Sequence, residues 1–366
     1  MEKKVKIGLI GTGMVSQQYI KGCRGFDILD LVACSDIDLE RAKTVARQWN
    51  IPKACSVEEL LADPEIQIVI NLTIPQAHVP VSEAVVEAGK HVYSEKPLAV
   101  TLEDGKRLLA AARKKGVLVG CAPDTFLGSG HQMCRKLIDE GAIGEPIAAV
   151  AFWTEYIMSG PPGRDFTFQP GCGPMLDMGS YYVTALINLL GPVKRVTGTV
   201  RKIFPERLVT EGEYKGRRIP IEVPTYITGT LDFTAGPVGT IITSYDVYEG
   251  SGLPKIEVYG TKGLLSVADP NIHGGVVRLR RPGYDWEEIP VRHSNKLGRG
   301  VGVADMAYAI TYSRPHRASG ELAYHALEVM TAFERASASG RHIEIESQVN
   351  RPAPLPPGLA EGQLNE

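Results

Sequence analysis

The stretch GLIGTGMVS, residues 8–16, follows the apolar run KVKIGLI at residues 4–10, which predicts a β-strand, and opens a helical pattern. Between a strand and a helix, Gly11 permits a tight turn and Gly13 lets the backbone approach a pyrophosphate. The helix start offers free N–H groups and the positive end of its dipole. Ser16, at the third glycine position of the fingerprint, is small enough for helix and strand to pack closely. The stretch therefore predicts a dinucleotide site built from Gly11, Thr12, Gly13, Met14 and Val15; the alternative is a strand–turn–helix without a ligand.

Strands and helices alternate around this stretch. Such alternation indicates βαβ units and a parallel sheet, so we expect an N-terminal doubly wound Rossmann domain at residues 1–122. The expected strands are 4–10, 29–35, 66–72, 91–94 and 117–121, and the expected helices are 40–50, 80–88 and 102–115.

The pattern changes after about residue 145. Strands then dominate, and TYITGTLDF (225–233) alternates with period 2, which indicates a mostly antiparallel sheet. We expect a C-terminal α+β domain on a large open sheet at 123–348, followed by a flexible Pro/Gly-rich tail at 349–366. The expected strands are 145–156, 193–204, 226–233, 239–247, 255–259, 264–268, 276–280 and 286–291, and the expected helices are 175–190, 304–310 and 320–338.

Composition excludes several classes of partner. With 40 basic against 42 acidic residues in 366, the chain has no charge imbalance that would attract nucleic acid or an anionic membrane. The sequence has no run of 18 apolar residues, so we expect no membrane span. The 6 cysteines are scattered without a C-x-x-C pair, and no cluster has metal-ligand spacing, so we expect a cytoplasmic protein without disulfides or a metal.

An acid ends the second expected strand. Asp36 can accept hydrogen bonds from the adenosine ribose hydroxyls, and its charge repels a 2′-phosphate. Ile37 follows it, and no arginine stands immediately after. Both features favour NAD over NADP. The alternative role for Asp36 is a helix cap, which Asp38 can fill instead.

Two further loops follow strands of the expected parallel sheet, where loops face the cofactor crevice. In TIPQAH (73–78), the residues expected to line the dinucleotide are Thr73, Ile74 and Pro75. His78 either lies near the nicotinamide ribose or caps the next helix.

The second loop carries EKP, residues 95–97, where Glu95 and Lys96 are expected beside the cofactor. Burial or a neighbouring cation can lower the pKa of a lysine there, and Pro97 restricts its backbone. On the residues alone, a solvated surface lysine is the stronger alternative.

GLIGTGMVS, Asp36, TIPQAH, EKP and a later D-x-G-x-aromatic motif occur in this order. Together they resemble the Gfo/Idh/MocA oxidoreductase family over residues 4–345. The resemblance implies NAD(P)-linked hydride transfer at a carbohydrate, polyol or related carbinol. It also implies that the C-terminal sheet serves both substrate binding and subunit contacts, so we expect a homodimer or homotetramer.

The D-x-G-x-aromatic motif is DMGSY, residues 177–181. Many relatives have a catalytic histidine at its last position, whereas this chain has Tyr181, as in the glucose–fructose oxidoreductase and dihydrodiol dehydrogenase branch. The resemblance implies that Tyr181 removes the hydroxyl proton and that Lys96 hydrogen-bonds the same oxygen. Asp177 would bind a neighbouring hydroxyl or orient Lys96, and Tyr182 is expected to pack. The alternative is an early-turn acid and a core tyrosine.

Further substrate contacts are expected from polar and aromatic residues, which suit polyhydroxylated ligands. Each such residue taken alone is more often structural, and we expect two or three to touch the substrate. With Lys96, Asp177 and Tyr181, the candidates are Asp124, Trp153, Tyr156, Arg164, Asp165 and His273.

The sequence thus predicts an NAD-dependent dehydrogenase that takes hydride from a secondary alcohol of a sugar, glycoside or cyclic polyol. One alternative is a redox-neutral enzyme that keeps NAD bound and uses transient oxidation to drive elimination or glycoside cleavage. Another is a non-catalytic NAD-sensing regulator, against which the presence of Lys96, Asp177 and Tyr181 argues.

Overall fold

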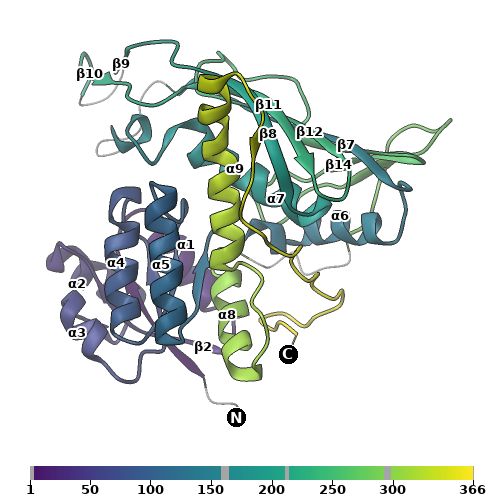
Figure 1. Ribbon diagram of the computed structural model, residues 1–366. Helices are drawn as coiled ribbons and strands as arrows, with labels where there is room; N and C mark the ends of the chain where they lie inside the picture. The colour runs from purple at the N-terminus through teal and green to yellow at the C-terminus, as the bar shows by residue number, and fades with distance from the viewer. Residues whose placement is uncertain (1–3, 158–164, 211–213, 292–297, 366) are drawn as a thin grey trace. The chain divides into compact units, whose positions relative to one another are not determined.

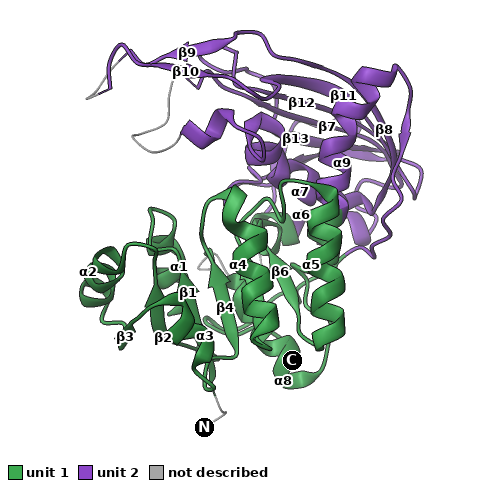
Figure 2. Ribbon diagram, turned by 60° about the vertical axis from the view of Figure 1, so that its left-hand side comes forward, with its two compact units in different colours: residues 1–132, 292–324, 352–366 green, residues 133–291, 325–351 purple. Residues whose placement is uncertain are grey.

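The computed structural model describes residues 4–157, 165–210, 214–291 and 298–365. The chain folds into two compact units, drawn in green and purple in Figure 2: unit 1 holds residues 1–132, 292–324 and 352–366, and unit 2 holds 133–291 and 325–351. This division differs from the expected boundary near residue 122, because two late segments return to unit 1. A pattern read along the chain does not reveal such a return.

Unit 1 is built on a six-stranded parallel sheet with the order β3-β2-β1-β4-β5-β6. Its central strands are apolar and buried, as in sheets covered on both faces, and Ile7, Leu9 and Ile68 are fully inaccessible to solvent. The strand order reverses between β1 and β4, where parallel sheets bind ligands at the carboxyl edge. The strands are β1 (Val5–Ile10), β2 (Leu29–Ser35), β3 (Lys53–Ala54), β4 (Ile68–Asn71), β5 (His91–Ser94) and β6 (Val119–Cys121).

The helices of unit 1 begin and end at recognisable caps. The Asp38 side chain accepts the N–H groups of Glu40 and Arg41 at the start of α2, and α5 ends at Gly116 with φ +70°. Helices α4 and α5 lie side by side (Figure 1). The helices are α1 (Ser16–Cys23), α2 (Leu39–Trp49), α3 (Val57–Ala62), α4 (Pro75–Glu87), α5 (Leu102–Lys115), the short η1 (Thr125–Leu127) and α8 (Val301–Tyr312).

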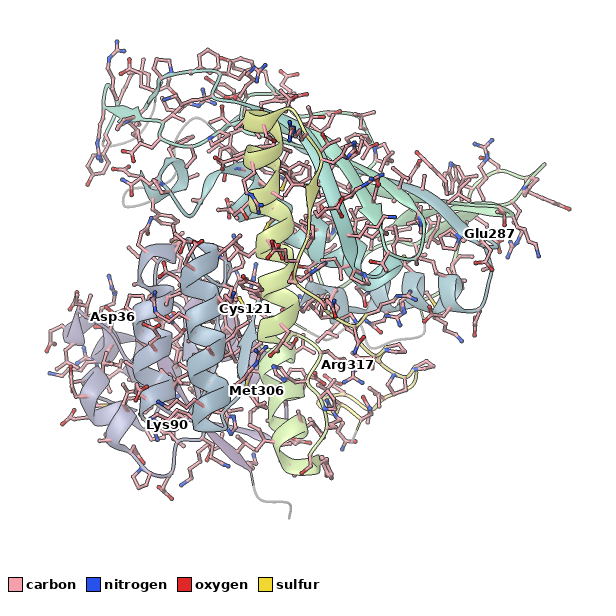
Figure 3. All side chains as sticks on the ribbon, in the orientation of Figure 1. Asp36, Lys90, Cys121, Glu287, Met306 and Arg317 are labelled. Carbon is pink, nitrogen blue, oxygen red and sulfur yellow. The ribbon has the colours of Figure 1, made fainter. Side chains whose placement is uncertain are left out.

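The C-terminal segment, expected to be a flexible tail from residue 349, packs on unit 1 from residue 352 onward. The buried guanidinium of Arg317 (labelled in Figure 3) donates to the carbonyls of Ala353 at 2.9 Å and Pro354 at 3.2 Å. Leu355 and Leu364 are each 4% exposed. The expectation of a loose tail is corrected by these contacts, since buried leucines and a buried arginine bind the segment despite its polar composition.

Unit 2 is built on a nine-stranded sheet with the order β16-β15-β14-β13-β7-β12-β11-β8-β17. Neighbouring strands are antiparallel, except that β7 and β12 run parallel. The strands are β7 (Pro146–Thr154), β8 (Val193–Arg201), β11 (Tyr226–Phe233), β12 (Val238–Ser244), β13 (Ile256–Gly260), β14 (Gly263–Val267), β15 (Arg278–Arg280), β16 (Glu287–Glu288) and β17 (Ile343–Glu344). A separate hairpin pairs β9 (Glu206–Leu208) with β10 (Arg218–Pro220).

Helices cover one face of this sheet. A Cβ at Gly198 or Gly229 would lie 2.9 or 2.6 Å from the ring of Phe333, so two glycines let α9 pack closely on the strands. None of the helices in the described ranges has the length and apolar character that crossing a lipid bilayer requires. The helical segments are α6 (Ser129–Asp139), η2 (Asp165–Phe168), η3 (Met175–Gly179), α7 (Ser180–Leu190) and α9 (Gly320–Ser339); α6 begins and α9 starts in unit 1.

Candidate active site

The β1–α1 turn has a backbone that accepts only glycine at one point and is open at another. Gly11 has φ +96°, and a Cβ there would lie 2.7 Å from the carbonyl oxygen of Leu72. A Cβ at Gly13 would have no atom within 4 Å, so the backbone of this residue faces open space. The buried Ser16 hydroxyl donates to the carbonyl of Gly13 at 2.6 Å. The turn therefore fits a pyrophosphate approaching its N–H groups, as a dinucleotide would.

Large apolar side chains stand in solvent on three loops of the same carboxyl edge. Met14, Ile37 and Ile74 are 68%, 99% and 52% exposed, whereas Thr12 and Pro75 are buried. Grouped exposure of this kind marks surfaces that bind a ligand. Met14, Ile37 and Ile74 therefore lie on the loops that the sequence predicts to line the dinucleotide site.

Asp36 directly follows β2, and five donor groups surround its buried carboxylate. The Thr12 N–H donates to Oδ2 at 2.7 Å, the Thr12 hydroxyl at 2.8 Å, and the Asp38 N–H to Oδ1 at 2.9 Å. Arg41 supplies two more donors. Burial opposes ionisation of Asp36, but the hydrogen bonds from Arg41, Thr12 and Asp38 outweigh it and hold the pKa of this carboxyl below its usual value. Asp38, rather than Asp36, caps α2.

The β4–α4 loop is organised by two buried side chains. Asn71 accepts from the Thr73 hydroxyl at 2.7 Å and donates to the carbonyl of His78 at 2.9 Å. The His78 ring contacts the carbonyl of Pro97 at 2.7 Å and that of Thr73 at 3.0 Å. Burial lowers the pKa of His78, although both carbonyls favour its charged form. The buried His78 ring thus connects this loop to the EKP loop. Both of its ring nitrogens contact backbone carbonyls, so neither is left to contact a cofactor.

Lys96 is the second residue after β5 and is half-buried. Its N–H donates to the Glu95 carboxylate at 3.1 Å, and the same carboxylate accepts from the Tyr19 hydroxyl at 2.9 Å and from Arg299 Nη1 at 3.2 Å. Burial and then the charge of Glu95 raise the pKa of Tyr19 well above its usual value, so its hydroxyl remains a donor. Glu95 therefore serves as an internal acceptor beneath Lys96. Tyr19 and Arg299 carry no motif, which is why the sequence did not indicate them.

Asp124, expected to contact substrate, holds the start of a helix instead. Its side chain is fully buried, and Oδ2 accepts the N–H groups of Gly300 at 3.2 Å and Gly302 at 3.0 Å. These N–H groups belong to the first turn of α8, whose dipole favours an anion at that end. The segment that it anchors lies 176 residues later in the chain, so no local pattern predicts the contact.

In unit 2, the DMGSY motif spans the junction of a π-helical turn with α7. Asp177 lies in the π-helix η3 and is half-buried, whereas Tyr181 in α7 is 3% exposed. A Cβ at Gly179 would lie 2.6 Å from Met175 Sδ and 3.3 Å from the Thr243 methyl on β12, so glycine lets the turn pack against the sheet. Single π-helical turns occur frequently at functional sites.

Tyr245, which the sequence did not indicate, hydrogen-bonds Asp177. Its hydroxyl donates to Asp177 Oδ2 at 2.8 Å, and its ring is 1% exposed. The ring packs edge-on against Trp153 at 5.6 Å and Phe168 at 5.9 Å between centroids. Trp153 is itself only 4% exposed. The structure therefore uses Trp153, an expected substrate residue, to hold the tyrosine that positions Asp177.

Tyr182 packs, as the sequence predicts. It is fully buried, and its hydroxyl has no hydrogen-bond partner among the described residues. Burial raises the pKa of this phenol far above its usual value. The two adjacent tyrosines of the motif are thus distinct in their surroundings.

Other expected substrate residues lie around Arg207, at the β9–β10 hairpin. The buried guanidinium of Arg207 pairs with Asp246 and lies 4.7 Å from the ring centroid of Tyr156, which stacks on Tyr248 at 3.9 Å. Asp165 pairs with Arg217 of the same hairpin. His273 is half-buried in a loop after β14, and Arg164 lies outside the described residues.

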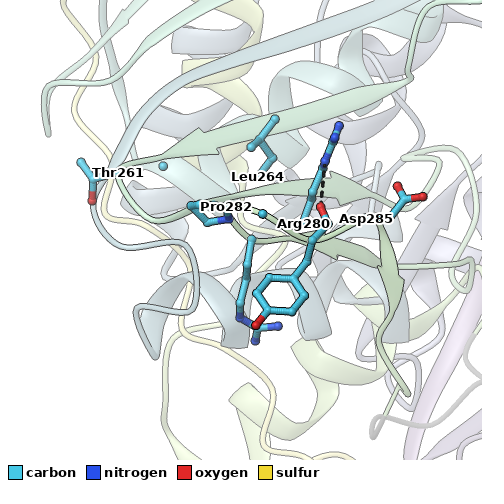
Figure 4. Close-up of a pocket in the computed structure, with 10 residues that line it drawn as sticks. Thr261, Leu264, Arg280, Pro282 and Asp285 are labelled. Carbon is cyan, nitrogen blue, oxygen red and sulfur yellow. Dashed lines mark hydrogen bonds between the residues drawn. The ribbon is translucent and has the colours of Figure 1, made fainter.

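A cavity of about 540 Å³ lies elsewhere in unit 2, at the turns that follow β13 and β15 (Figure 4). None of the expected site residues that the structure describes lines it, and its walls include Thr261, Leu264, Arg280, Pro282 and Asp285. In the described part of the chain, no three His, Cys, Asp or Glu side chains gather in a way that could hold a metal ion.

Comparison with known families matches two consecutive regions of the chain. Residues 5–122 match the oxidoreductase family with an NAD-binding Rossmann fold, and residues 131–266 match the GFO/IDH/MocA C-terminal domain. The trans-1,2-dihydrobenzene-1,2-diol dehydrogenase of Xenopus laevis is 32% identical over 63% of this chain and 72% of its own length. The 1,5-anhydro-D-fructose reductase of Ensifer adhaerens is 28% identical over 93% of this chain and 98% of its own.

Solved structures show the same fold over nearly the whole chain. Levoglucosan dehydrogenase in its apo form is 20% identical, with a TM-score of 0.82 over 95% of this chain and 100% of that chain. Its complex with NADH and levoglucosan is 19% identical, with a TM-score of 0.81 over 94% of this chain and 100% of that chain.

Proposed function

This chain belongs to the Gfo/Idh/MocA family of oxidoreductases, and we propose that it oxidises a secondary alcohol of a sugar, glycoside or cyclic polyol with NAD as hydride acceptor. Its residues 5–122 form an NAD-binding Rossmann domain. Three relatives support this substrate class: a 1,5-anhydro-D-fructose reductase, a dihydrobenzenediol dehydrogenase and a levoglucosan dehydrogenase.

The observation that carries the proposal is the position of Lys96 in unit 1. It follows β5, and only β4 separates β5 from β1, whose carboxyl end opens into the glycine turn. A cation on this edge lies on the same side of the sheet as the predicted dinucleotide site. Two features favour a functional lysine over a solvated surface lysine. Lys96 comes shortly after a buried strand, and the buried Glu95 carboxylate accepts its backbone N–H.

The proposed roles divide between the two motifs. Bound NAD would supply the hydride acceptor for the carbinol carbon. Tyr181 takes the proton of the hydroxyl as that hydride departs, so that a ketone forms. Lys96 hydrogen-bonds the same oxygen and stabilises the negative charge that develops on it. Asp177, held by Tyr245, binds a neighbouring hydroxyl of the substrate and fixes which carbon reacts.

The test is a screen of sugars, inositols and glycosides for NAD reduction, with the product identified by NMR. On an accepted substrate, Tyr181→Phe should lower turnover about 100-fold or more, the range of general acid–base catalysis, with NADH binding intact. Tyr182→Phe is the matched control and should leave turnover unchanged, because its hydroxyl has no partner in the described chain. Near-normal turnover in Tyr181→Phe would show that Tyr181 is not the catalytic base. Product formation without net NADH would instead favour a redox-neutral reaction.

We also propose that two copies associate through the sheet of unit 2. Phe152 on β7 lies opposite Ile242 on β12, and both side chains are half-exposed, whereas their neighbours Ala151 and Ile241 are buried. The face opposite the helices thus carries apolar side chains that a second copy would cover. Light scattering should report a dimer or tetramer, and Ile242→Lys should shift it toward the monomer; a monomeric wild-type chain would contradict this part. The reduced, scattered cysteines support a cytoplasmic location for the assembly.

A further inference from the structure

Asp36 and Arg41 form a two-point ion pair at the adenosine end of the proposed cofactor site. Arg41 Nη2 lies 2.5 Å from Asp36 Oδ1, and Nε lies 3.1 Å from Oδ2. The Asp36 side chain is 2% exposed, whereas that of Arg41 is 49% exposed. Asp36 is labelled in Figure 3. A guanidinium in this fork geometry is thus anchored to the carboxylate while its outer edge stays in solvent.

The donors around Asp36 leave no acceptor site for a ribose. A carboxylate accepts about four hydrogen bonds. Two donors from Thr12, the Asp38 N–H and the two Arg41 groups already meet it. Thr12 and the Asp38 N–H are fixed by the glycine turn and by the cap of α2. Arg41 is the one donor on a long, half-exposed side chain, so it is the donor that a ribose hydroxyl displaces.

The ion pair also removes the electrostatic repulsion that would disfavour binding of NADP. An isolated Asp36 would repel a 2′-phosphate, but the Arg41 guanidinium cancels its charge at hydrogen-bond distance. A guanidinium released from Asp36 presents the planar fork that binds phosphate at two points. An arginine directly after the acid is the usual sequence signal for NADP; here the arginine stands five residues later, and the first turn of α2 brings it back to Asp36.

We propose that Arg41 is a specificity-determining residue that lets this enzyme bind both NAD and NADP. It yields Asp36 to the 2′-hydroxyl of NAD, and it holds the 2′-phosphate of NADP. The inference rests on the proposed function, because it requires that the β1–α1 turn bind a dinucleotide.

The test is direct binding of NADH and NADPH, followed by their fluorescence, in wild type, Arg41→Gln and Lys43→Gln. Lys43 is an exposed cation on the same helix that pairs with Glu40 and controls for a general loss of positive charge. Wild type should bind the two cofactors within about tenfold of one another. Arg41→Gln should weaken NADPH at least about tenfold with NADH unchanged or tighter, as loss of a charge-assisted pair predicts.

Lys43→Gln should keep the NADPH-to-NADH ratio within about twofold of wild type. An unchanged ratio in Arg41→Gln, or NADPH binding more than about 100-fold weaker than NADH in wild type, would overturn the role of Arg41 and leave the proposed oxidoreductase untouched. Failure of wild type and control to bind either cofactor would instead overturn the proposed function, and this inference with it.

Discussion

The Tyr245 hydroxyl donates a hydrogen bond of 2.8 Å to the carboxylate of Asp177, from a ring that is buried between Trp153 and Phe168. The fixed ring holds the carboxylate in one orientation. The Tyr245→Phe substitution keeps the packing and removes only the hydroxyl. Since a hydrogen bond to a charged group contributes about 1.5–3 kcal/mol, we expect kcat/KM to fall by roughly 10- to 100-fold.

The measurement is steady-state kinetics on the substrate found in the screen, with Tyr182→Phe again as the matched control. A positioning role for Tyr245 predicts a change in KM or in which hydroxyl is oxidised, with the thermal midpoint close to that of wild type. If kcat/KM and product identity both stay as in wild type, Asp177 does not depend on Tyr245.

Asp124 gives a second prediction because its carboxylate serves the backbone of α8. Asp124→Ala leaves the N–H groups of Gly300 and Gly302 buried without their acceptor, so we expect a loss of about 3 kcal/mol or more of stability. Asp124→Asn retains an acceptor oxygen and should recover part of it. Urea unfolding measures both variants, and the KM of folded protein should match wild type. A raised KM with unchanged stability would return Asp124 to the substrate site.

Much of the fold follows from the sequence because local pattern and tertiary structure agree there. The strands 29–35, 91–94 and 226–233 and the helix 102–115 have the expected bounds, since apolar runs, the Thr101 cap and Gly116 mark them. The β9–β10 hairpin and α6 were not expected. Their short or mixed patterns carry no strong period, and long-range packing fixes them.

The candidate site divides in the same way. The motif residues Gly11, Gly13 and Gly179 occupy positions where a Cβ would clash or would obstruct an open approach. Glycine at these positions therefore has a physical reason in addition to the family resemblance. Tyr245 and Arg299 were missed because their partners lie 68 and 204 residues away. The sequence does not indicate the influence of Arg41 on Asp36, because the arginine stands five residues after the acid and only the first turn of α2 brings it back.

The packed C-terminal segment gives a third prediction. Ending the chain at residue 351 removes the buried Leu355 and Leu364 and the carbonyls that Arg317 binds. Two buried leucines alone contribute about 3 kcal/mol or more, so the truncated chain should unfold at a lower temperature. In the full chain, proteinase K should leave residues 353–366 intact while unit 1 stays folded. Rapid clipping of this segment, with no change in the thermal midpoint, would restore the loose tail.

Buried and half-buried histidines set the response of stability to acid. Burial lowers the pKa of His78, His316 and His325, and it lowers that of His91 together with the charge of His316. Each ring has a backbone partner: His91 accepts from the Leu118 N–H at 2.9 Å, for example. Protonation would break such contacts or place a charge in the interior.

Stability should therefore fall as the pH drops from about 7.5 to about 5. Below the ordinary histidine pKa of 6.5, these histidines are protonated in the unfolded chain but stay neutral in the folded chain. The unfolded state therefore binds more protons, and acid favours it. This contribution is fully present above that pKa and is lost below it, in a window where carboxyls remain ionised. Thermal midpoints across the window measure the slope. His325→Asn should reduce the slope, whereas substitution of the exposed His342 should leave it unchanged; equal slopes in both variants would exclude His325 as a source.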